Sequence, residues 1–585
     1  MWIVRINMTD RSYKVEDVPE KYAKLGGRGI TSMIVADEVP PLAHPLGPNN
    51  KLVIAPGLLS GTAAPTSSRI SVGAKSPLTG GIKESNAGAA FAPSMNKLGI
   101  KAIVIEGKPE EKGKFWTISI KWGGDKPVVE FHPADEYVGQ SLYKVFPKVY
   151  EKFGKVNICG IGTAGELGYG NSGVVFDDLK GRPSRYSGRG GTGAVMGSKG
   201  VKFIVIDPKG GPGITYADKA RFNEGAKKLR AALMEHPVTK PKGGLNTYGT
   251  AILVNIINEA GALPTRNFRS GRFEGAAKIS GEAIFETNKE RTGKEVYNHA
   301  CSPGCIIQCS NTYYGKDGKE IVSCIEYESD WALGANCGID DLDAIAEMVR
   351  LCNDYGLDTI EMGDAIAVAM DAGYIEFGDA EGAIKLIHEV GKGTPIGRIL
   401  GSGTETTGRV FANPRIPTVK GQGMPAYEPR AIKGIGVTYA TTPMGADHTS
   451  GYTIATEILN VGGSSEPLKA IKEKAKLSRD FQATTAFLDM IGHCIFIAFA
   501  ILDIPSGFEG MVEEVNGLLG TDYTGEDVGR IGMEIVEKEL AFNHAAGFTK
   551  ADDRLPEFMK YEKLPPHNVV NDLPDEIFDA VWNEA

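Results

Sequence analysis

Three closely spaced cysteines constrain this chain more than any other feature. Cys301, Cys305 and Cys309 have the spacing C-x3-C-x3-C, and Cys494 ends the segment Asp489-Met-Ile-Gly-His-Cys494, in a chain with eight cysteines. Four thiolates can hold one [4Fe–4S] cluster, and a sequence-distant fourth ligand would join two parts of the fold. Zinc normally takes paired knuckles or two added histidines, and this sequence offers neither. The spacing favours an iron–sulfur cluster over a zinc site or a disulfide.

Composition sets the broad class. The chain has 585 residues, 42% of them hydrophobic and 23% charged, which is typical of a globular protein with two to four domains. Its net charge of −9 argues against a nucleic-acid partner. The start of the chain does not read as a signal peptide, and the most apolar stretch, 494–504, is shorter than the about 20 residues of a membrane span. We therefore expect a cytoplasmic protein with no membrane span.

The hydrophobic pattern predicts an α+β fold in three domains. Residues 1–208 contain short β-branched runs bounded by glycine and proline, which indicate an N-terminal β-sheet base. Residues 209–415 are predicted to be a helical domain that carries the cysteine triplet in a loop. Residues 416–585 are predicted to be a second, mainly helical domain that carries Cys494.

One glycine-rich segment formally matches a dinucleotide-binding motif. Gly188, Gly190 and Gly193 spell G-x-G-x-x-G. That motif requires a strand before it and a full crossover helix after it. Here Lys180-Gly-Arg-Pro-Ser precedes it in place of a predicted strand, and a new strand starts within about eight residues. We therefore expect glycine turns that present backbone N–H groups, with Arg69 and Arg185 nearby, to a polar or anionic ligand.

Two predicted helix ends share one pattern. A helix over 341–352 is followed by Asn353-x-x-Gly-Leu-Asp358, and a helix over 482–491 ends in Asp489-x-x-Gly-His-Cys494. A glycine in the left-handed region would close each helix, and Asp358 with Glu361 would form a capping box for the next one. We call each of these helix ends, Asn353–Asp358 and Asp489–Cys494, a corner. The repetition suggests two equivalent ligands held in similar ways.

Several longer segments carry a family resemblance. They are Pro77–Gly80, Gly188–Lys199, Tyr248–Asn258, Glu326-Tyr-Glu-Ser and Trp331–Asn336. On these segments the chain resembles the tungsten-containing aldehyde:ferredoxin oxidoreductases along nearly its whole length. The resemblance implies a β base for two metallopterins that share one tungsten, with helical domains and a [4Fe–4S] cluster alongside.

The resemblance also implies a role for individual residues. Cys301, Cys305, Cys309 and Cys494 would bind the cluster. A Mg²⁺ ion would join the pterin phosphates. The residues around the pterins and this ion would be Arg69, Asn86, Gly88, Arg185, Tyr186, Asn353, Leu357, Asp358, Asp489 and His493.

Glu328 and His448 match the pair beside the metal in this family. His448 could polarise an aldehyde carbonyl, and Glu328 could take a proton from the attacking water. Cys324, four residues before Glu328, could also reach the metal, although we expect an ordinary buried thiol.

The sequence departs from the family pattern at several points. Asn353 stands where an aspartate is usual, and Ser450 where some relatives have lysine. Instead of a repeated Glu-x-x-His motif, the chain has Glu347-Met-Val-Arg350 and Lys385-Leu-Ile-His388. We therefore expect an oligomer without a bridging metal, partnered by ferredoxin or a ferredoxin-like subunit with or without a flavin subunit. The segment 564–585 also resembles the family members that pair with a ferredoxin-like subunit.

The leading interpretation is oxidation of aldehydes to carboxylic acids. One alternative within the same family is reduction of the ring of an aromatic thioester. Another is a non-catalytic iron–sulfur electron-transfer or scaffold subunit, which would need neither the two corners nor the Glu328/His448 pair.

Overall fold

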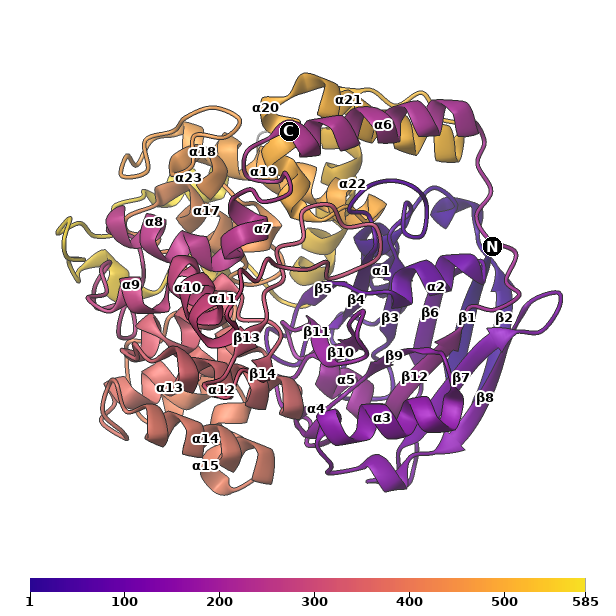
Figure 1. Cartoon of the computed structure of the whole chain (residues 1–585), viewed down its shortest axis with the longest axis horizontal. Coiled ribbons are helices and arrows are strands. Elements are labelled where there is room, and N and C mark those ends of the chain that lie inside the picture. Colours follow the sequence, from indigo (N-terminus) through magenta and orange to yellow (C-terminus); the bar gives the residue numbers. More distant parts are fainter. Residues whose placement is uncertain (584–585) are drawn as a thin grey trace.

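The computed structural model describes residues 1–583. The strands gather on one side of the molecule, in indigo to violet in Figure 1, and the later helices cover the opposite side and the top. The predicted α+β class, with an N-terminal sheet region followed by helices, is confirmed. The border predicted at 415 stays a prediction.

Within the described residues, the first sheet has six strands in the order β2-β1-β6-β3-β4-β5. Only β1 and β6 are parallel, and the other neighbours are antiparallel. The strands are β1 (Trp2–Asn7), β2 (Ser12–Asp17), β3 (Leu52–Pro56), β4 (Arg69–Lys75), β5 (Ile82–Gly88) and β6 (Ile100–Glu106). Helices α1 (Gly27–Glu38) and α2 (Phe91–Lys97) connect them.

The second sheet, also in this described part, repeats the first. Its order β8-β7-β12-β9-β10-β11 corresponds strand for strand, with β7 and β12 as the parallel pair. The strands are β7 (Trp116–Trp122), β8 (Pro127–Pro133), β9 (Asn157–Gly160), β10 (Val174–Asp177), β11 (Pro183–Ser187) and β12 (Val201–Asp207). Helices α3 (Leu142–Phe153), α4 (Thr163–Glu166) and α5 (Thr192–Ser198) connect them. The region is thus two copies of one unit.

The two copies form one platform. A single hydrophobic core contains side chains from both sheets, such as Ile54 and Val72 of the first and Ile118 and Ile204 of the second. Burial of these β-branched residues on strands of both units holds the sheets together. Edge strands β5 and β11 lie against each other, so the equivalent edges of the two units meet. Loops that leave these strands therefore converge on one region.

The glycine-rich segment is not a dinucleotide fold, as predicted, but one part of the reasoning was wrong. Strand β11 does lie directly before Gly188. The helix that follows, α5, has seven residues and leads to β12, which pairs antiparallel with β9 and not with β11. The parallel strand–helix–strand unit that a dinucleotide site requires is therefore missing from this part of the described chain.

The helices that follow the platform form the rest of the molecule. They are α6 (Lys219–Glu235), α7 (Gly244–Tyr248), α8 (Leu253–Glu259), α9 (Ala276–Ile279), α10 (Gly281–Thr292), α11 (Tyr327–Leu333), α12 (Leu342–Tyr355), α13 (Thr359–Asp371), α14 (Ala380–Lys392), α15 (Pro395–Gly401), α16 (Thr404–Val410), α17 (Lys433–Thr441), α18 (Ile454–Glu457), α19 (Glu473–Ile491), α20 (Ala498–Asp503), α21 (Pro505–Leu519), α22 (Gly525–Ala545) and α23 (Asp575–Ala580). Two-residue and three-residue strands form the ribbons β13 (Tyr313–Tyr314) with β14 (Glu320–Val322) and β15 (Thr418–Val419) with β16 (Gln422–Gly423).

No single helix among residues 1–583 is long and apolar enough to cross a membrane. Helix α19 together with Ile495–Asp503 meets the length and composition test only as a pair bent by 120°. The predicted segment 564–585 includes residues 584 and 585, which lie outside the described residues.

Candidate functional site: a cavity between the platform and the helices

A cavity of about 370 Å³ lies where the platform meets the helices. Fourteen of the sixteen predicted site residues line it, and the exceptions are Cys305 and His493. Those that line it are Arg69, Asn86, Gly88, Arg185, Tyr186, Cys301, Cys309, Glu328, Asn353, Leu357, Asp358, His448, Asp489 and Cys494. Residues spread over more than 400 positions of sequence therefore converge on one space.

The four predicted cluster ligands lie close to one another as free thiols. A hydrogen bond from Cys305, with help from Arg185 and Arg69, lowers the pKa of Cys301 to about 5. Burial raises the pKa of Cys494, and Arg69 opposes that rise. Buried thiols beside fixed cations suit thiolate ligation.

Gly88 allows the cysteine loop to approach the platform. A Cβ atom at this position would lie 2.6 Å from Sγ of Cys301 and 3.1 Å from Nη1 of Arg69. Arg69 also donates from Nε to Oδ1 of Asn86 on the neighbouring strand. The guanidinium is therefore fixed between the cysteine loop and strand β5, where any larger residue than glycine at 88 would displace it.

The two predicted corners are attached to the platform in the same way. At the first, the carbonyl of Gly356 accepts from the N–H of Gly173 (3.0 Å), and the N–H of Asp358 donates to the carbonyl of Asn171 (2.8 Å). Asn171 and Gly173 lie in the segment between β9 and β10 of the second sheet. Gly356 has a φ of 80°. The left-handed φ confirms the predicted glycine stop.

The second corner repeats these contacts in the first sheet. The carbonyl of Gly492 accepts from the N–H of Arg69 (3.3 Å), and the N–H of Cys494 donates to the carbonyl of Thr66 (3.1 Å). Gly492 has φ of 92°, and the partner loop follows β3, the counterpart of β9. The repeated sheets therefore hold two equivalent helix ends against one cavity.

Side chains at the first corner differ in part from expectation. Asp358 caps α13 by accepting from Ile360 N–H, but the predicted capping box is wrong, because Glu361 is buried and accepts from Thr404 and Gly423 N–H instead. Oδ2 of Asp358 also lies 3.2 Å from Nε of Arg189.

Arg189 is a cavity residue that the sequence reasoning missed. It donates to the carbonyl oxygens of Ala446 (2.7 Å) and Gly423 (2.6 Å) and faces Asp358. Arg189 lies within Gly188-Arg-Gly-Gly, the glycine-rich segment that the sequence analysis already expected to face a ligand. That position could have identified it, but Arg185 was named as the ligand-facing arginine instead. Its guanidinium ties the glycine loop to the segments on both sides of the cavity.

The second corner carries a buried carboxylate that is only partly compensated. Asp489 accepts from Nη1 of Arg28 at 3.2 Å, and Arg28 is shared with Glu539 at 2.8 Å. Burial, together with the nearby Glu84, raises the pKa of Asp489 to about 8. An aspartic acid that is protonated at neutral pH can donate a hydrogen bond into the cavity as well as accept one.

His493 does not face the cavity. Its Nε2 lies 2.8 Å from Oε2 of Glu514, and both side chains are fully buried. Its Nδ1 lies 3.4 Å from the carbonyl of Thr66. The side chain therefore fastens the second corner to α21 and the platform, and a direct ligand contact for the imidazole does not fit this position.

Glu328 and His448 meet across the cavity from different segments. Glu328 lies in the first turn of α11, and His448 begins the short helical turn His448–Ser450. His448 Nε2 lies 3.4 Å from Glu328 Oε1, while Glu328 Oε2 accepts from the N–H of Ala426 at 2.9 Å. Neither Oε1 of Glu328 nor Nδ1 of His448 has a hydrogen-bond partner within the described protein. Both atoms are buried without a hydrogen bond, and both residues line the cavity.

Burial sets the protonation of this pair. It raises the pKa of Glu328 to about 8 and lowers the pKa of His448 to about 4. The N–H of Ala426 partly opposes the first shift, and Asp447 opposes the second. At neutral pH the site therefore holds a mostly protonated carboxylic acid beside a neutral imidazole.

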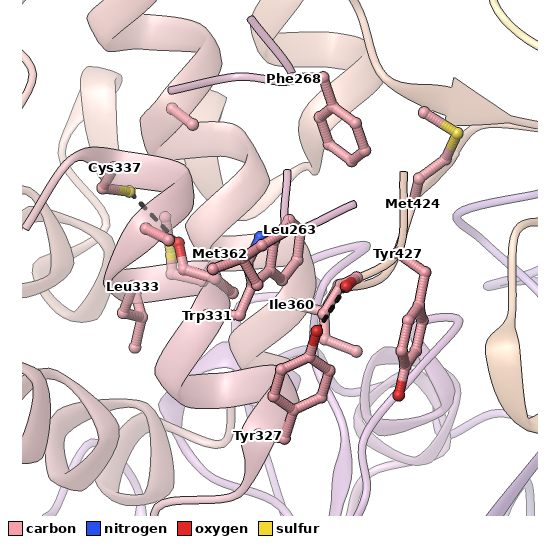
Figure 2. Close-up of a cluster of buried hydrophobic side chains, with 14 of the residues drawn as sticks. Leu263, Phe268, Tyr327, Trp331, Leu333, Cys337, Ile360, Met362, Met424 and Tyr427 are labelled. Atoms are coloured by element: carbon pink, nitrogen blue, oxygen red, sulfur yellow. Dashed lines mark hydrogen bonds between the residues drawn. The ribbon is translucent and has the colours of Figure 1, made fainter. Parts of the chain in front are cut away.

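The helix that carries Glu328 is anchored in a large apolar core. Figure 2 shows Tyr327 and Trp331 of α11 among buried side chains that include Phe268 and Met424. Tyr327 donates to the carbonyl of Ala426 at 2.7 Å, and Trp331 packs edge-on against Phe268. These contacts fix the position of α11 and so hold Glu328 at the cavity.

Cys324 also reaches the cavity. Its thiol donates to Oε1 of Glu326 (2.7 Å) and accepts from Nη2 of Arg185 (3.0 Å), and burial raises its pKa. Because it is hydrogen-bonded to both Glu326 and Arg185, the Cys324 thiol differs from the ordinary buried thiol that was expected. Whether it touches a metal stays a prediction.

The cavity is suited to a large, polar metallocofactor. Buried polar atoms without protein partners, such as Nε of Arg185, Oε1 of Glu328 and Nδ1 of His448, belong to residues that line it. Cys301, Cys309 and Cys494 line the cavity, and Gly88 leaves room for the cysteine loop beside it. Within residues 1–583, no group of three or more His, Cys, Asp or Glu could hold a single metal ion.

Together the duplicated platform, the paired corners and the thiol cluster define a class of large redox metalloprotein. The model of the aldehyde ferredoxin oxidoreductase N-terminal domain matches residues 3–208, and the model of domains 2 and 3 matches residues 224–584. The chain therefore belongs to the aldehyde ferredoxin oxidoreductase family and is an oxidoreductase.

Individual relatives agree with this assignment. The chain is 37% identical to a tungsten-containing aldehyde ferredoxin oxidoreductase of Pyrococcus furiosus, over 96% of this chain and 91% of that protein. A protein of the same description from Thermococcus kodakarensis is 36% identical over 96% of this chain and 91% of its own length. Among solved structures, the active-site complex of benzoyl coenzyme A reductase with 1,5 dienoyl-CoA has a TM-score of 0.80 at 18% identity, covering 99% and 92% of the two chains. This last likeness shows the fold.

Proposed function

We propose that this protein oxidises aldehydes to carboxylic acids in the cavity, at a tungsten bis-pterin centre beside a [4Fe–4S] cluster. The support is the pairing of Glu328 with His448, each with one unpartnered atom beside the predicted cofactor residues. The relatives named as tungsten-containing aldehyde ferredoxin oxidoreductases support the same reaction.

The two corners and the edge strands would hold the pterins. Asp358 and Asp489 offer carboxyl groups, and Arg69, Arg185 and Asn86 offer hydrogen bonds from the platform. Asn86 and Tyr186 would lie near a Mg²⁺ ion bound together with the pterins. When bound, the tungsten centre would accept the electron pair of the aldehyde C–H bond, and the cluster would pass the electrons on one at a time.

The protein's own groups would handle the protons. Addition of water to the carbonyl forms a C–O bond and releases a proton, and loss of the C–H bond gives up two electrons and a second proton. Neutral His448 can donate a hydrogen bond to the carbonyl oxygen and polarise it. Glu328, with a pKa near 8, is suited to accept the proton of the attacking water and release it again.

The test is aldehyde-dependent reduction of a viologen dye by protein purified without air. Glu328→Gln and His448→Asn should each lower kcat by about 10²–10⁴-fold, with tungsten and iron contents unchanged. Glu347→Gln, on the exposed face of α12, is the matched control and should keep full activity. Unchanged rates in the first two variants would remove this pair from the mechanism.

Ferredoxin or a ferredoxin-like subunit would take the electrons, with or without a flavin subunit. Within this same family a second reaction, reduction of an aromatic thioester ring, is favoured by one observation, the thiol of Cys324 in the cavity. A substrate assay distinguishes the two reactions. A ring reductase would convert benzoyl-CoA in the presence of a low-potential electron donor and would not oxidise aldehydes.

A further inference from the structure

The two corners share their backbone contacts, but the side chains behind them differ. Arg28 is the second residue of α1, and Tyr143 is the second residue of α3, the helix at the same place in the repeated unit. Asp489 and Asn353 each stand three residues before the stop glycine of their corner. Arg28 with Asp489 at the second corner therefore corresponds to Tyr143 with Asn353 at the first.

At the second corner, Arg28 holds one oxygen of Asp489. Its Nη1 donates to Oδ2 of Asp489 at 3.2 Å, and the Arg28 side chain is only 2% exposed. Arg28 is itself fixed, because its Nε and Nη2 donate to the two carboxylate oxygens of Glu539 at 2.9 and 2.8 Å. The start of α1 can come this close because residue 27 is glycine. A Cβ atom at Gly27 would lie 2.1 Å from the carbonyl oxygen of Asp489.

The other carboxyl oxygen of Asp489 is left without a protein partner. Oδ1 makes no hydrogen bond to another described residue, and the Asp489 side chain, which is 16% exposed, lines the cavity. Arginine has no acceptor, so a proton on Asp489 cannot be donated by the oxygen that faces Arg28. In its neutral form Asp489 therefore carries its proton on Oδ1, the oxygen that Arg28 does not occupy.

The surrounding charges keep Asp489 mostly neutral at pH 7. Burial and the nearby Glu84 of β5 raise the pKa of Asp489 to about 8, and Arg28 and Arg69 of β4 oppose that rise. Glu539 of α22 acts through Arg28, whose charge it shares. A carboxylic acid that stays protonated near neutral pH can serve as a hydrogen-bond donor.

The first corner offers a group that does not titrate. The amide of Asn353 has both N–H groups and an oxygen at every pH, and Asn353 lines the same cavity. Tyr143 stands at the position of Arg28. Burial raises the pKa of Tyr143 and Asn353 opposes that rise, so these two side chains are neighbours. The N–H of Tyr143 also donates to Oδ1 of Asp354 at 3.3 Å, which shows that α3 begins against the first corner.

We propose that Arg28 is a positioning residue that orients Asp489 so that its protonated carboxyl group donates a hydrogen bond to the pterin at the second corner. The amide of Asn353 takes this part at the first corner. The inference rests on the proposed bis-pterin site and adds to it a proton that only one corner can lose. The two pterins are therefore held alike at neutral pH and unequally at high pH.

The first experiment uses pH to separate the two corners. Above about pH 8 Asp489 loses its proton and can only accept. The holoenzyme should therefore release pterin about tenfold faster at about pH 9.5 than at about pH 7, the effect of one lost hydrogen bond. Release in moderate urea, without air, is followed by the fluorescence of the freed pterin. Asp489→Asn has an N–H donor at every pH, so it should keep its pterin and show no such change.

The second experiment removes Arg28 together with Glu539, so that neither charge is left unpaired. Arg28→Met/Glu539→Gln should release pterin about tenfold faster than the parent at about pH 7, because Asp489 is then free to turn. Lys202→Met/Glu166→Gln removes a buried ion pair outside the cavity lining and is the control, which should release pterin at the parent rate. If Arg28→Met/Glu539→Gln does not fold, the comparison of Asp489→Asn with the parent decides alone.

Three results would each overturn the proposal. One is a parent release rate that does not change between about pH 7 and about pH 9.5. Another is an equal pH dependence in Asp489→Asn and the parent. The third is a folded Arg28→Met/Glu539→Gln variant that holds pterin as well as the control does. A protein that holds pterin but oxidises no aldehyde would contradict the proposed function and leave these comparisons valid, whereas a protein without pterin would contradict both.

Discussion

Nε2 of His448 lies 3.4 Å from Oε1 of Glu328, and the two side chains reach this distance from segments about 120 residues apart. Glu328 is held in place by the hydrogen bond from the N–H of Ala426. His448 is held in place through its neighbour Asp447, which pairs with buried Lys83. Both residues line the cavity, and Nδ1 of His448 is buried without a hydrogen-bond partner among the described residues. The pair is thus positioned by its surroundings and open to a substrate.

The protonation of Glu328 should govern the pH dependence of the reaction. Because burial raises its pKa to about 8, a base at this position becomes effective as the pH rises. We predict that kcat/KM increases between pH 6 and about 8 and then levels off, while His448, with a pKa near 4, contributes no change in this range. A rate profile that is flat from pH 6 to 9 would contradict this assignment.

The same shift affects stability in a defined direction. A carboxyl group whose pKa is higher in the folded state favours folding only while it is protonated. The contribution of Glu328 to the free energy of unfolding should therefore decrease as the pH rises from its ordinary pKa of 4.5 towards 8. Denaturation of Glu328→Gln at several pH values should show a weaker decrease than the parent, and an identical slope would argue against the shift.

The corner at Gly492 should tolerate no side chain. A Cβ there would lie 2.7 Å from Cα of Gly57, and the residue has φ of 92°. Gly373 is the matched control, since it has φ of 81° and open space around its Cβ. Gly373→Ala should cost about 1–2 kcal/mol of stability from backbone strain alone. Gly492→Ala should cost more and reduce the pterin content, as measured by denaturation and by fluorescence of the released pterin.

Equal losses of stability in these two alanine variants, with full pterin content in both, would show that the close approach of Gly492 to Gly57 is unimportant. Gly356→Ala should behave like Gly492→Ala, because a Cβ there would lie 2.9 Å from the backbone nitrogen of Gly162.

The ion pair of Lys83 with Asp447 should be essential to the fold of the site. Its atoms are 2.9 Å apart, and the Lys83 side chain is fully buried. Lys83→Met would leave the Asp447 carboxylate buried without its nearest cation, which should cost about 3–5 kcal/mol. The double variant Lys83→Met/Asp447→Asn should recover part of this loss in chemical denaturation. A double variant that is no more stable than Lys83→Met would refute the compensation.

Removing one predicted cluster ligand should remove the cluster. Cys494→Ser should lose most of its iron and the near-visible absorbance of an iron–sulfur cluster, because three thiolates and a hydroxyl hold it poorly. Cys159→Ser, in the buried core of β9, is the control and should keep both. Full iron content in the Cys494 variant would exclude this residue as a ligand.

Much of the fold was predictable because local patterns determine it. The short β-branched runs expected within residues 1–208 appear as strands such as β3, β4, β6, β7 and β12. The glycine stops at Gly356 and Gly492 were predictable as well, because a left-handed helix end is a local requirement of the backbone. The duplication of the two sheets was not, because it lies in strand order and pairing and not in repeated sequence letters.

The site was predictable to the extent that motifs marked it. The thiols, the corners and the Glu328/His448 pair came from short patterns and family resemblance, and the structure brings most of them to one cavity. The role of Arg189 and the orientation of His493 away from the cavity were missed, because both depend on which partners lie across the fold. A sequence position alone does not state which way a side chain points.

Metal content of the wild-type protein, purified without air, tests the central claim most directly. Four neighbouring thiols, of which those of Cys301, Cys309 and Cys494 line the cavity, lie beside two matching helix ends on a duplicated platform. They predict about four iron atoms and about one tungsten atom per chain in elemental analysis. Zinc alone, or a protein with neither iron nor tungsten, would contradict it.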